Sequence, residues 1–295
     1  MKKRILIAGG TGLIGKQLTQ HLRSKGHKVD ILTRNPKNAD EFRWDPQIGV
    51  LDYPYLSEVQ ILINLSGAGI ADSRWTKARK KELIDSRVGT NHFLYSRVDE
   101  MNSLEQFICS SGISAYGYST DDKLFTESDP FGDDFVSQLV RSWEESANLF
   151  QSKYRVCKIR TAVVLSREGG ALKRMLTPIQ FGIGSALGNG RQIMSWIHSD
   201  DLIALFEHCI NQQLEGPFNA VGGNVSNAEF MRTLATVTNK PFFFPNVPAF
   251  ALKMVFGEMS DLLLKGAAAS NQKICSTGFK FNHTDLKSAI SAILA

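Results

Sequence analysis

Short apolar runs recur along the first half of the chain, and stretches with helical periodicity separate them. The runs fit buried parallel strands, because strands covered on both faces read as continuous apolar segments. They occupy residues Arg4 to Ala8, Lys28 to Leu32, Ile61 to Leu65, Gln106 to Ser110 and Val156 to Leu165. This alternation of strand and helix predicts an α/β fold with a doubly wound parallel sheet.

One predicted helix is well marked by the spacing of its apolar side chains. They recur every three or four positions behind an acidic pair at residues 133 and 134, and they are Phe135, Leu139, Trp143, Ala147 and Phe150. An acidic start followed by an apolar stripe indicates an amphipathic helix that packs one face on the sheet.

The sequence pattern changes at about residue 166, where glycine-rich loops and shorter helical stretches begin. We therefore predict a first domain over residues 1–165, with a strand and a helix also contributed from 195–225. A smaller C-terminal α/β lobe is predicted over residues 166–295. Within this lobe, the pattern predicts an apolar helix from Ala249 to Leu264 and a short strand from Gly278 to Phe281.

The charge of the chain is moderately positive. Its 295 residues include 34 Lys and Arg against 29 Asp and Glu, which gives a formal net charge of +5. The basic residues are scattered, whereas a nucleic-acid interface concentrates them on one face. An anionic small molecule is a sufficient reason for the excess. We expect a small-molecule substrate and no nucleic-acid partner, and the oligomeric state stays open.

The cysteines and the N-terminus bear on the compartment. Cys109, Cys157, Cys209 and Cys275 are separated by about fifty residues or more, so neither a metal-ligand nor a CxxC spacing occurs. We expect buried, reduced thiols and no metal site. The basic N-terminus leads directly into a strand, and no apolar run reaches the ~18 residues of a membrane span. These features predict a cytoplasmic protein without a membrane partner.

Three glycines stand three residues apart, directly between the first predicted strand and a helix that runs to about Lys25. Gly9 permits a tight turn, Gly12 lets the backbone approach a pyrophosphate, and Gly15 lets the helix pack closely on the strand. The helix N-terminus offers free N–H groups to an anion. A glycine-rich structural turn is the alternative. The residues predicted to bind a dinucleotide here are Gly9, Thr11, Gly12, Leu13, Ile14 and Gly15.

The end of the second predicted strand bears on which dinucleotide is bound. A site for NAD places a carboxylate there to hold the ribose 2′-hydroxyl, but Asp30 comes too early in the strand. Arg34 stands at the strand end, where a guanidinium pairs with a 2′-phosphate. The sequence therefore predicts NADP as the cofactor of a Rossmann domain; in the alternative, Arg34 only caps the surface.

Several multi-residue motifs occur in order along nearly the whole chain. Besides the glycine loop they are residues 64–68, 74–76, 85–88, 132–135, 160–165, 195–201, 247–252 and 257–259. With these motifs the chain resembles the extended short-chain dehydrogenase/reductase superfamily. More narrowly, it resembles the epimerase-like subgroup of the NAD-dependent epimerase/dehydratase family that carries a C-terminal domain of unknown function, here at about residues 240–288.

The resemblance implies further cofactor contacts. They are Thr33 and Arg34 at the adenosine end, Leu65, Ser66 and Gly67 along the ribose and pyrophosphate, Val163 near the nicotinamide, and Glu82 and Arg87 on a following helix. For Glu82 and Arg87 the alternative is a surface ion pair. For Val163 it is plain strand core.

Members of the superfamily that oxidise or epimerise substrates use a Tyr, a Lys that lowers the pKa of that Tyr, and a Ser or Thr that bonds the substrate oxygen. Ser111, at the end of the fourth strand, is the predicted substrate contact; a serine that caps the strand is the alternative. In the superfamily the Tyr and Lys precede a helical Glu by eight and four positions. Counting back from Glu145 gives Ser137 and Arg141, so the usual pair is replaced.

Arg141 keeps a positive charge in this place but does not deprotonate. His198 is the remaining candidate for proton transfer near neutral pH, although a lone histidine is more often structural. The first hypothesis is an NADP-dependent oxidoreductase or epimerase whose polar, phosphorylated or sugar-like substrate lies between the Rossmann domain and a lobe that contains Arg160, Arg191 and His198. The second is a non-catalytic or sensory NADP(H)-binding module. The third is a scaffold that docks partners on the apolar helix of the lobe.

Overall fold

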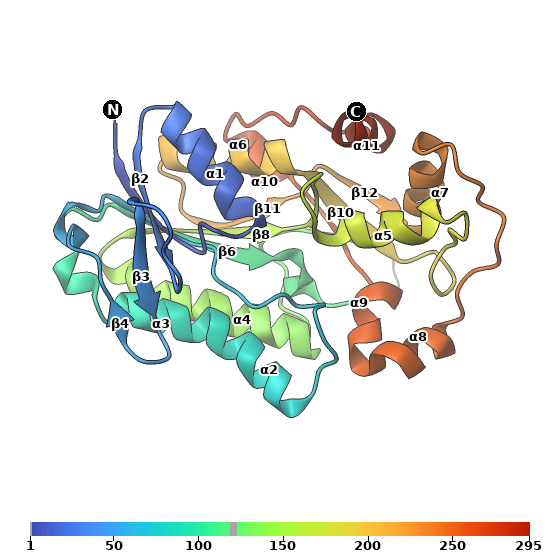
Figure 1. Ribbon diagram of the computed structural model, residues 1–295, viewed down its shortest axis with the longest axis horizontal. Helices are drawn as coiled ribbons and strands as arrows, with labels where there is room; N and C mark the ends of the chain where they lie inside the picture. The colour runs from blue at the N-terminus through green and yellow to red at the C-terminus, as the bar shows by residue number, and fades with distance from the viewer. Residues whose placement is uncertain (1, 119–122) are drawn as a thin grey trace.

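The computed structural model describes residues 2–118 and 123–295. An eight-stranded sheet forms its centre, in the order β11-β8-β6-β5-β1-β2-β3-β4 (Figure 1). All neighbouring strands are parallel except β3 and β4. The strands are β1 (Arg4–Ala8), β2 (Lys28–Thr33), β3 (Glu41–Asp45), β4 (Val50–Leu51), β5 (Ile61–Asn64), β6 (Gln106–Gly112), β8 (Arg155–Thr161) and β11 (Gly216–Ala220). The predicted doubly wound α/β fold is confirmed.

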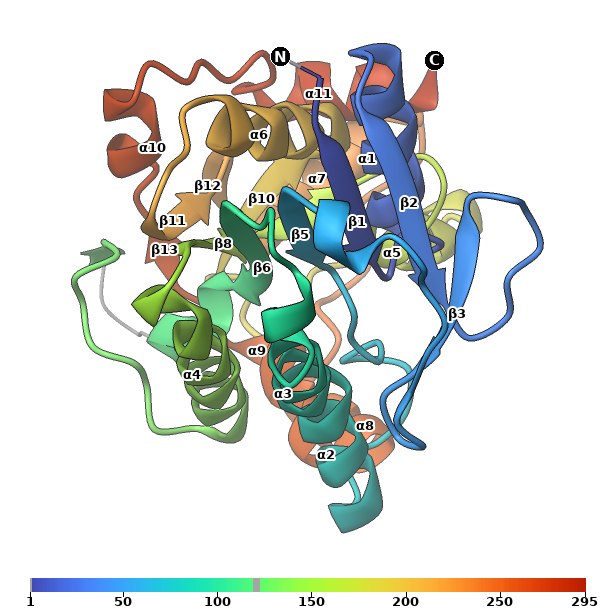
Figure 2. The same cartoon turned by 90° about the vertical axis from the view of Figure 1, so that its left-hand side faces the viewer.

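Helices cover both faces of this sheet, α1 and α6 on one side and α3 and α4 on the other (Figure 2). Their bounds are α1 (Leu13–Ser24), α6 (Ser199–Asn211), α3 (Thr90–Tyr95) and α4 (Phe135–Ala147). Alternate residues of β1 enter different cores: Ile5 packs in the cluster of α1 and α6, and Leu6 in the cluster of α4. Because both cores are apolar, β1 reads as a continuous apolar run.

The C-terminal half adds a second, three-stranded sheet in the order β12-β10-β9, and β7 pairs with β13. These strands are β7 (Leu124–Phe125), β9 (Val163–Leu165), β10 (Ile193–His198), β12 (Gly223–Ser226) and β13 (Ala268–Ala269). The remaining α-helices are α2 (Lys77–Ile84), α5 (Gly170–Gln180), α7 (Asn227–Val237), α8 (Ala249–Phe256), α9 (Asp261–Leu264), α10 (Gln272–Ser276) and α11 (Leu286–Leu294). A π-helical turn spans Asp85–Gly89, and 3₁₀ turns span Leu56–Glu58, Val98–Glu100, Ile113–Tyr116, Asn148–Ser152 and Gly257–Ser260.

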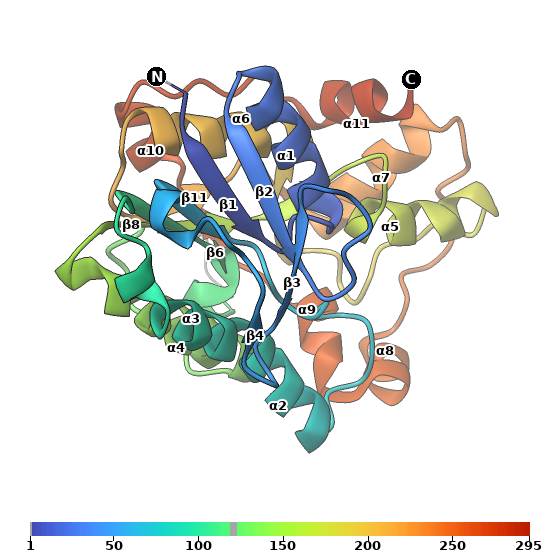
Figure 3. The ribbon, with the colours of Figure 1, turned by 60° about the vertical axis from the view of Figure 1, so that its left-hand side comes forward.

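The C-terminal helices α8 and α9 lie beside α2 (Figures 1 and 3). Lys80 of α2 pairs with Glu258 at 2.7 Å, and the Arg74 guanidinium donates to the carbonyl oxygen of Met254 at 3.1 Å. These contacts join the end of the chain to the segment that follows β5. Within the described ranges, none of the helices combines the length and hydropathy needed to cross a bilayer.

Several local predictions were wrong. The run from Val156 to Leu165 is two strands in different sheets, β8 and β9. The helix predicted from Ala249 to Leu264 breaks after Phe256, because Gly257 has a φ of 59° and ends α8 there. The segment from Gly278 to Phe281 is not a strand; its phenylalanines anchor an irregular segment, and Phe279 is buried. Three cysteines are buried as expected, but Cys275 is exposed.

Candidate functional site

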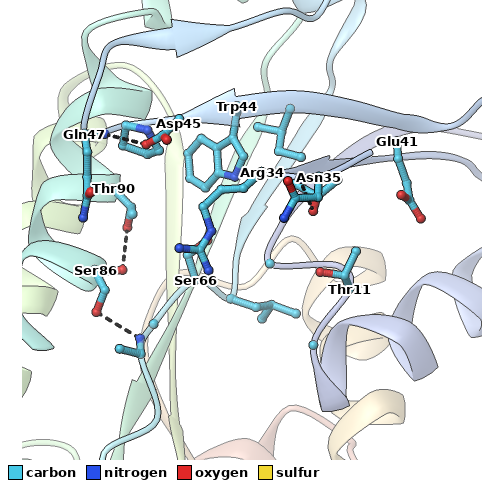
Figure 4. Close-up of a pocket in the computed structure, with 18 of the residues that line it drawn as sticks. Thr11, Arg34, Asn35, Glu41, Trp44, Asp45, Gln47, Ser66, Ser86 and Thr90 are labelled. Atoms are coloured by element: carbon cyan, nitrogen blue, oxygen red, sulfur yellow. Dashed lines mark hydrogen bonds between the residues drawn. The ribbon is translucent and has the colours of Figure 1, made fainter. Parts of the chain in front are cut away.

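A cavity of about 820 Å³ opens at the carboxyl ends of the central strands (Figure 4). β1 pairs with β2 on one side and with β5 on the other, so the chain connections diverge at this point of the sheet. Open α/β sheets bind ligands in the crevice that such a reversal creates. The loops that follow β1, β2 and β5 all contribute to the cavity wall.

The glycine loop after β1 is built for close packing. Gly9 has a φ of 80°, which an L side chain rarely adopts, and it lies against the backbone of Leu65. A Cβ on Gly15 would stand 2.3 Å from the carbonyl oxygen of Gly9, so this position excludes any side chain. Gly12 is the N-cap of α1 and provides no side-chain cap. The first turn of α1 therefore offers uncapped N–H groups to an anion.

The end of β2 carries positive charge. Asp30 is buried, as the sequence predicts, and its carboxylate accepts bonds from Arg4 at 3.2 Å and from the Tyr53 hydroxyl at 2.6 Å. It therefore does not face the cavity. Arg34 is exposed and lines the cavity, projecting into the space drawn in Figure 4.

Many of the predicted cofactor residues share this cavity. Those that line it are Gly9, Thr11, Gly12, Thr33, Arg34, Leu65, Ser66, Gly67 and Glu82. Leu13, Ile14, Gly15, Arg87 and Val163 lie outside its lining. The cofactor roles of both groups of residues stay predictions.

Sequence reasoning missed the wall of the cavity that β3 provides. Glu41, Trp44 and Asp45 of β3 line this wall, together with Lys37 from the preceding turn. The run Glu41–Asp45 alternates charged and aromatic residues. This alternation was the available signal, since it is typical of a half-exposed strand.

Two arginines hold the loop that follows β5. Arg87 donates to the carbonyl oxygen of Ala68 at 2.9 Å, and Arg79 donates to that of Gly69 at 2.5 Å. Glu82 pairs with Arg79 at 2.7 Å and not with Arg87, so the alternative of a Glu82–Arg87 ion pair is wrong. Burial lowers the pKa of Arg87 to about 10, and the charge of Arg79 adds to this shift. The structure thus concentrates positive charge beside the loop.

Ser111 belongs to a buried polar network. Its hydroxyl donates to Glu144 at 2.7 Å, and the Arg160 guanidinium bonds both oxygens of the same carboxylate at 2.7 and 3.0 Å. The Arg160 and Glu144 side chains are only 3% and 5% exposed. Arg160 also donates to the hydroxyl of Tyr116, which in turn donates to Asn219. Arg160 is therefore bonded within the protein. It belongs to β8 of the central sheet, so the hypothesis that placed it in the C-terminal lobe was wrong on this point.

Ser137 and Arg141, at the predicted positions of the Tyr–Lys pair, are also bonded to other residues of the protein. Ser137 is fully buried, and its hydroxyl lies within bonding distance of the Asp134 carboxylate and of the Ser114 carbonyl oxygen. Arg141 is exposed and pairs with Glu145 at 3.0 Å. Neither Ser137 nor Arg141 lines the cavity. Their roles stay predictions.

His198 lies in the second sheet, and like Ser111 it is outside the cavity lining. Its Nδ1 accepts the backbone N–H of Asp200 at 3.1 Å, and its ring stacks on His283 at 3.8 Å. Burial lowers the pKa of His198, and the adjacent His283 lowers it further. His198, Asp200 and His283 are close enough to suggest a metal site. The Nδ1 of His198 is bonded to the backbone, and its Nε2 is buried without a hydrogen-bond partner among the residues that the structure describes.

A doubly wound sheet, a glycine loop before an uncapped helix and a cavity at the sheet reversal together define a dinucleotide-binding protein. Residues 5–220 match the NAD dependent epimerase/dehydratase family, and residues 247–293 match a domain of unknown function (DUF1731). The chain belongs to the NAD-dependent epimerase/dehydratase family, as the sequence motifs predict. The C-terminal match ends a few residues beyond the predicted range of about 240–288.

Relatives match along almost the entire chain. The epimerase family protein SDR39U1 of Mus musculus is 34% identical over an alignment of 299 positions that covers 99% of this chain and 100% of that protein. The epimerase family protein Mb2239 of Mycobacterium bovis is 38% identical over 291 residues, 97% of this chain and 96% of that protein. The crystal structure of human SDR39U1 (isoform 2) with NADPH superposes with a TM-score of 0.90 at 31% identity and covers 98% of both chains.

Proposed function

We propose that the protein binds NADP(H) in the 820 Å³ cavity. The observation that carries this proposal is the charge at the end of β2. Asp30 is bonded to Arg4 and Tyr53 inside the core, and Arg34 projects into the cavity instead. A 2′-phosphate matches a guanidinium in this place, whereas a ribose 2′-hydroxyl matches a carboxylate. The human relative whose structure contains NADPH supports the same choice.

The residues present fit such a cofactor. The uncapped N-terminus of α1 and Gly12 would hold the pyrophosphate, because Gly12 has no side chain between the backbone and the cavity. Arg34 and Thr33 would hold the adenosine end. Asp45 at the end of β3 also lines the cavity, and its carboxylate would accept from the adenine amino group.

We further propose that the protein is an oxidoreductase or epimerase-like enzyme that acts on a small polar molecule such as a sugar nucleotide. When bound, the nicotinamide supplies or accepts a hydride. The protein has no Tyr–Lys pair eight and four positions before either helical glutamate, Glu144 or Glu145. Glu144, not Glu145, is buried, and counting back from it gives Val136 and Val140, which are both buried.

A second candidate function is an NADP(H)-binding module without turnover. The observation that favours it is that two hydroxyls are already occupied within the protein, namely that of Ser111, the predicted substrate contact, and that of Ser137, which stands in place of the Tyr. Ser111 donates to Glu144, and Ser137 is fully buried. Each hydroxyl is bonded to a carboxylate of the protein, Ser111 to Glu144 and Ser137 to Asp134. A carboxylate is a far weaker base than a serine alkoxide, so both hydroxyls keep their protons at neutral pH and neither replaces a Tyr–Lys pair.

Cofactor titration tests the first proposal. Intrinsic fluorescence should show tighter binding of NADPH than of NADH. Arg34→Ala should weaken the binding of NADPH by about 2 kcal/mol and leave the binding of NADH almost unchanged. Arg191→Ala is a matched control, because this exposed arginine does not line the cavity. Equal losses for both cofactors would refute the assignment of the 2′-phosphate to Arg34.

Turnover separates the two candidate functions. The wild-type protein is incubated with NADPH and a panel of carbonyl compounds and nucleotide sugars, and NADPH absorbance and sugar interconversion are followed. Turnover that disappears in a variant unable to bind NADPH supports the enzyme. Tight NADPH binding without turnover on the whole panel favours the binding module.

A further inference from the structure

Three cationic side chains line the cavity on the side of α1 and β2. Lys16 comes from the first turns of α1, Arg34 from the end of β2, and Lys37 from the turn before β3. Within residues 2–118 and 123–295, none of the three takes part in an ion pair, whereas the nearby Arg23 pairs with Asp40. Three cations left unpaired around one cavity are a match for a group of two negative charges.

A second hollow of about 290 Å³ adjoins the first. Thr11, Lys16, Asn38 and Glu41 line both spaces, so they form the boundary between α1 and the turn before β3. Of these four residues, Glu41 carries a negative charge. A carboxylate at a phosphate site repels the ligand unless it has another task.

Glu41 has such a task, because both of its oxygens hold the turn. One accepts the backbone N–H of Lys37 at 2.7 Å, and the other accepts from the side-chain amide of Asn38 at 2.6 Å. These bonds lower the pKa of Glu41, the Lys37 N–H contributing most. The bonds fix the backbone at residue 37 on the cavity rim.

We propose that Lys16 and Lys37 bind the cofactor 2′-phosphate together with Arg34, and that Glu41 is a positioning residue that holds Lys37 in place. The inference rests on the proposed NADP(H) function. It extends the specificity site from one residue at the end of β2 to three elements, namely α1, β2 and the turn before β3. Because the two lysines are exposed, each contact contributes less than a buried ion pair would.

The experiment measures dissociation constants of the full chain for NADPH, NADH, adenosine 2′,5′-bisphosphate and 5′-AMP. Lys16→Ala and Lys37→Ala should each raise the dissociation constants of the two 2′-phosphorylated ligands about tenfold and change that of NADH by less than about twofold. Lys287→Ala is the control, since this exposed lysine of α11 lines neither hollow. Unchanged NADH affinity shows in each variant that the site is still folded.

Glu41→Gln distinguishes positioning from charge. Removal of a negative charge should strengthen phosphate binding if Glu41 only repels the ligand. If it positions Lys37, NADPH should bind about fivefold more weakly, and the substitution should add little in a Lys37→Ala background, as expected for coupled residues. Tighter or unchanged NADPH binding in Glu41→Gln overturns the positioning role.

The outcomes also separate this inference from the proposed function. If the wild type does not prefer NADPH, the proposed function fails. If the wild type prefers NADPH and Arg34→Ala abolishes the preference while both lysine variants retain it, only the present inference fails.

Discussion

Replacement of Arg160 with methionine tests whether the buried network behind Ser111 supports the fold or binds substrate. The Arg160 side chain is 3% exposed and bonds both oxygens of Glu144, whose side chain is 5% exposed. Methionine fills a similar volume but leaves the carboxylate with the Ser111 hydroxyl as its remaining donor in the network. Breaking a buried ion pair from one side costs about 3–5 kcal/mol, because the remaining charge stays desolvated.

This cost is a large part of the total stability of a domain, which is commonly about 5–15 kcal/mol. At roughly 2–3 °C per kcal/mol for a chain of this size, the melting temperature should fall by about 6–15 °C. Thermal unfolding followed by circular dichroism measures the shift. NADPH affinity, measured well below the transition, should change by less than about twofold, since Arg160 does not line the cavity.

A double-mutant cycle with Glu144→Gln completes the test. The double variant should be more stable than the sum of the two single losses predicts, because it leaves no unpaired charge. If Arg160 instead binds substrate, Arg160→Met should melt within about 2 °C of the wild type and lose activity only. That result would refute the structural role.

Two further predictions follow from the glycine loop and from the histidine pair. Gly12→Val should fold normally, since its Cβ would meet only the Gly9 carbonyl oxygen at 3.3 Å, but it should lose NADPH binding because the longer side chain would enter the cavity. Gly15→Ala should unfold at a lower temperature, because its Cβ would lie 2.3 Å from the same carbonyl oxygen. Circular dichroism beside cofactor titration distinguishes these two effects, and a folded Gly12→Val that binds NADPH normally would contradict the first. Burial holds the folded-state pKa of His198 below the ordinary value of about 6.5, so the unfolded chain binds more protons and stability should fall as the pH drops below about 6.5. His198→Asn retains a side-chain acceptor for the N-cap of α6, and urea midpoints between pH 7 and 5 should fall less in this variant than in the wild type; equal falls would rule out His198 as a contributor.

The centre of the fold could be predicted from the sequence because its strands are buried on both faces. β1 has the predicted bounds, and the glycine loop follows it directly. β3 was missed because Glu41–Asp45 lies near the sheet edge, where charged residues alternate with aromatic ones. The single apolar run from Val156 to Leu165 did not reveal its division between two sheets, because both of its parts enter apolar cores.

The polar part of the site was harder to predict, because pairing decides the role of a charge. Glu144 and Glu145 are adjacent, and the sequence does not show which of them is buried. The structure places Glu144 against Arg160 and Glu145 on the exposed face with Arg141. A shift of one position on a helix turns a side chain by about 100°. The residues eight and four positions before the buried glutamate are therefore Val136 and Val140.

These two valines bear on the chemistry left to the protein. Val140 lies 3.9 Å from the place where a Cβ of Gly112 would stand, so it packs at the end of β6 beside Ser111. Apolar side chains there exclude water and transfer no protons. Burial also raises the pKa of the nearby Tyr116, whose hydroxyl donates to Asn219 and thus keeps its proton at neutral pH. A proton transfer at this site would therefore use a group other than a Tyr–Lys pair in these two positions.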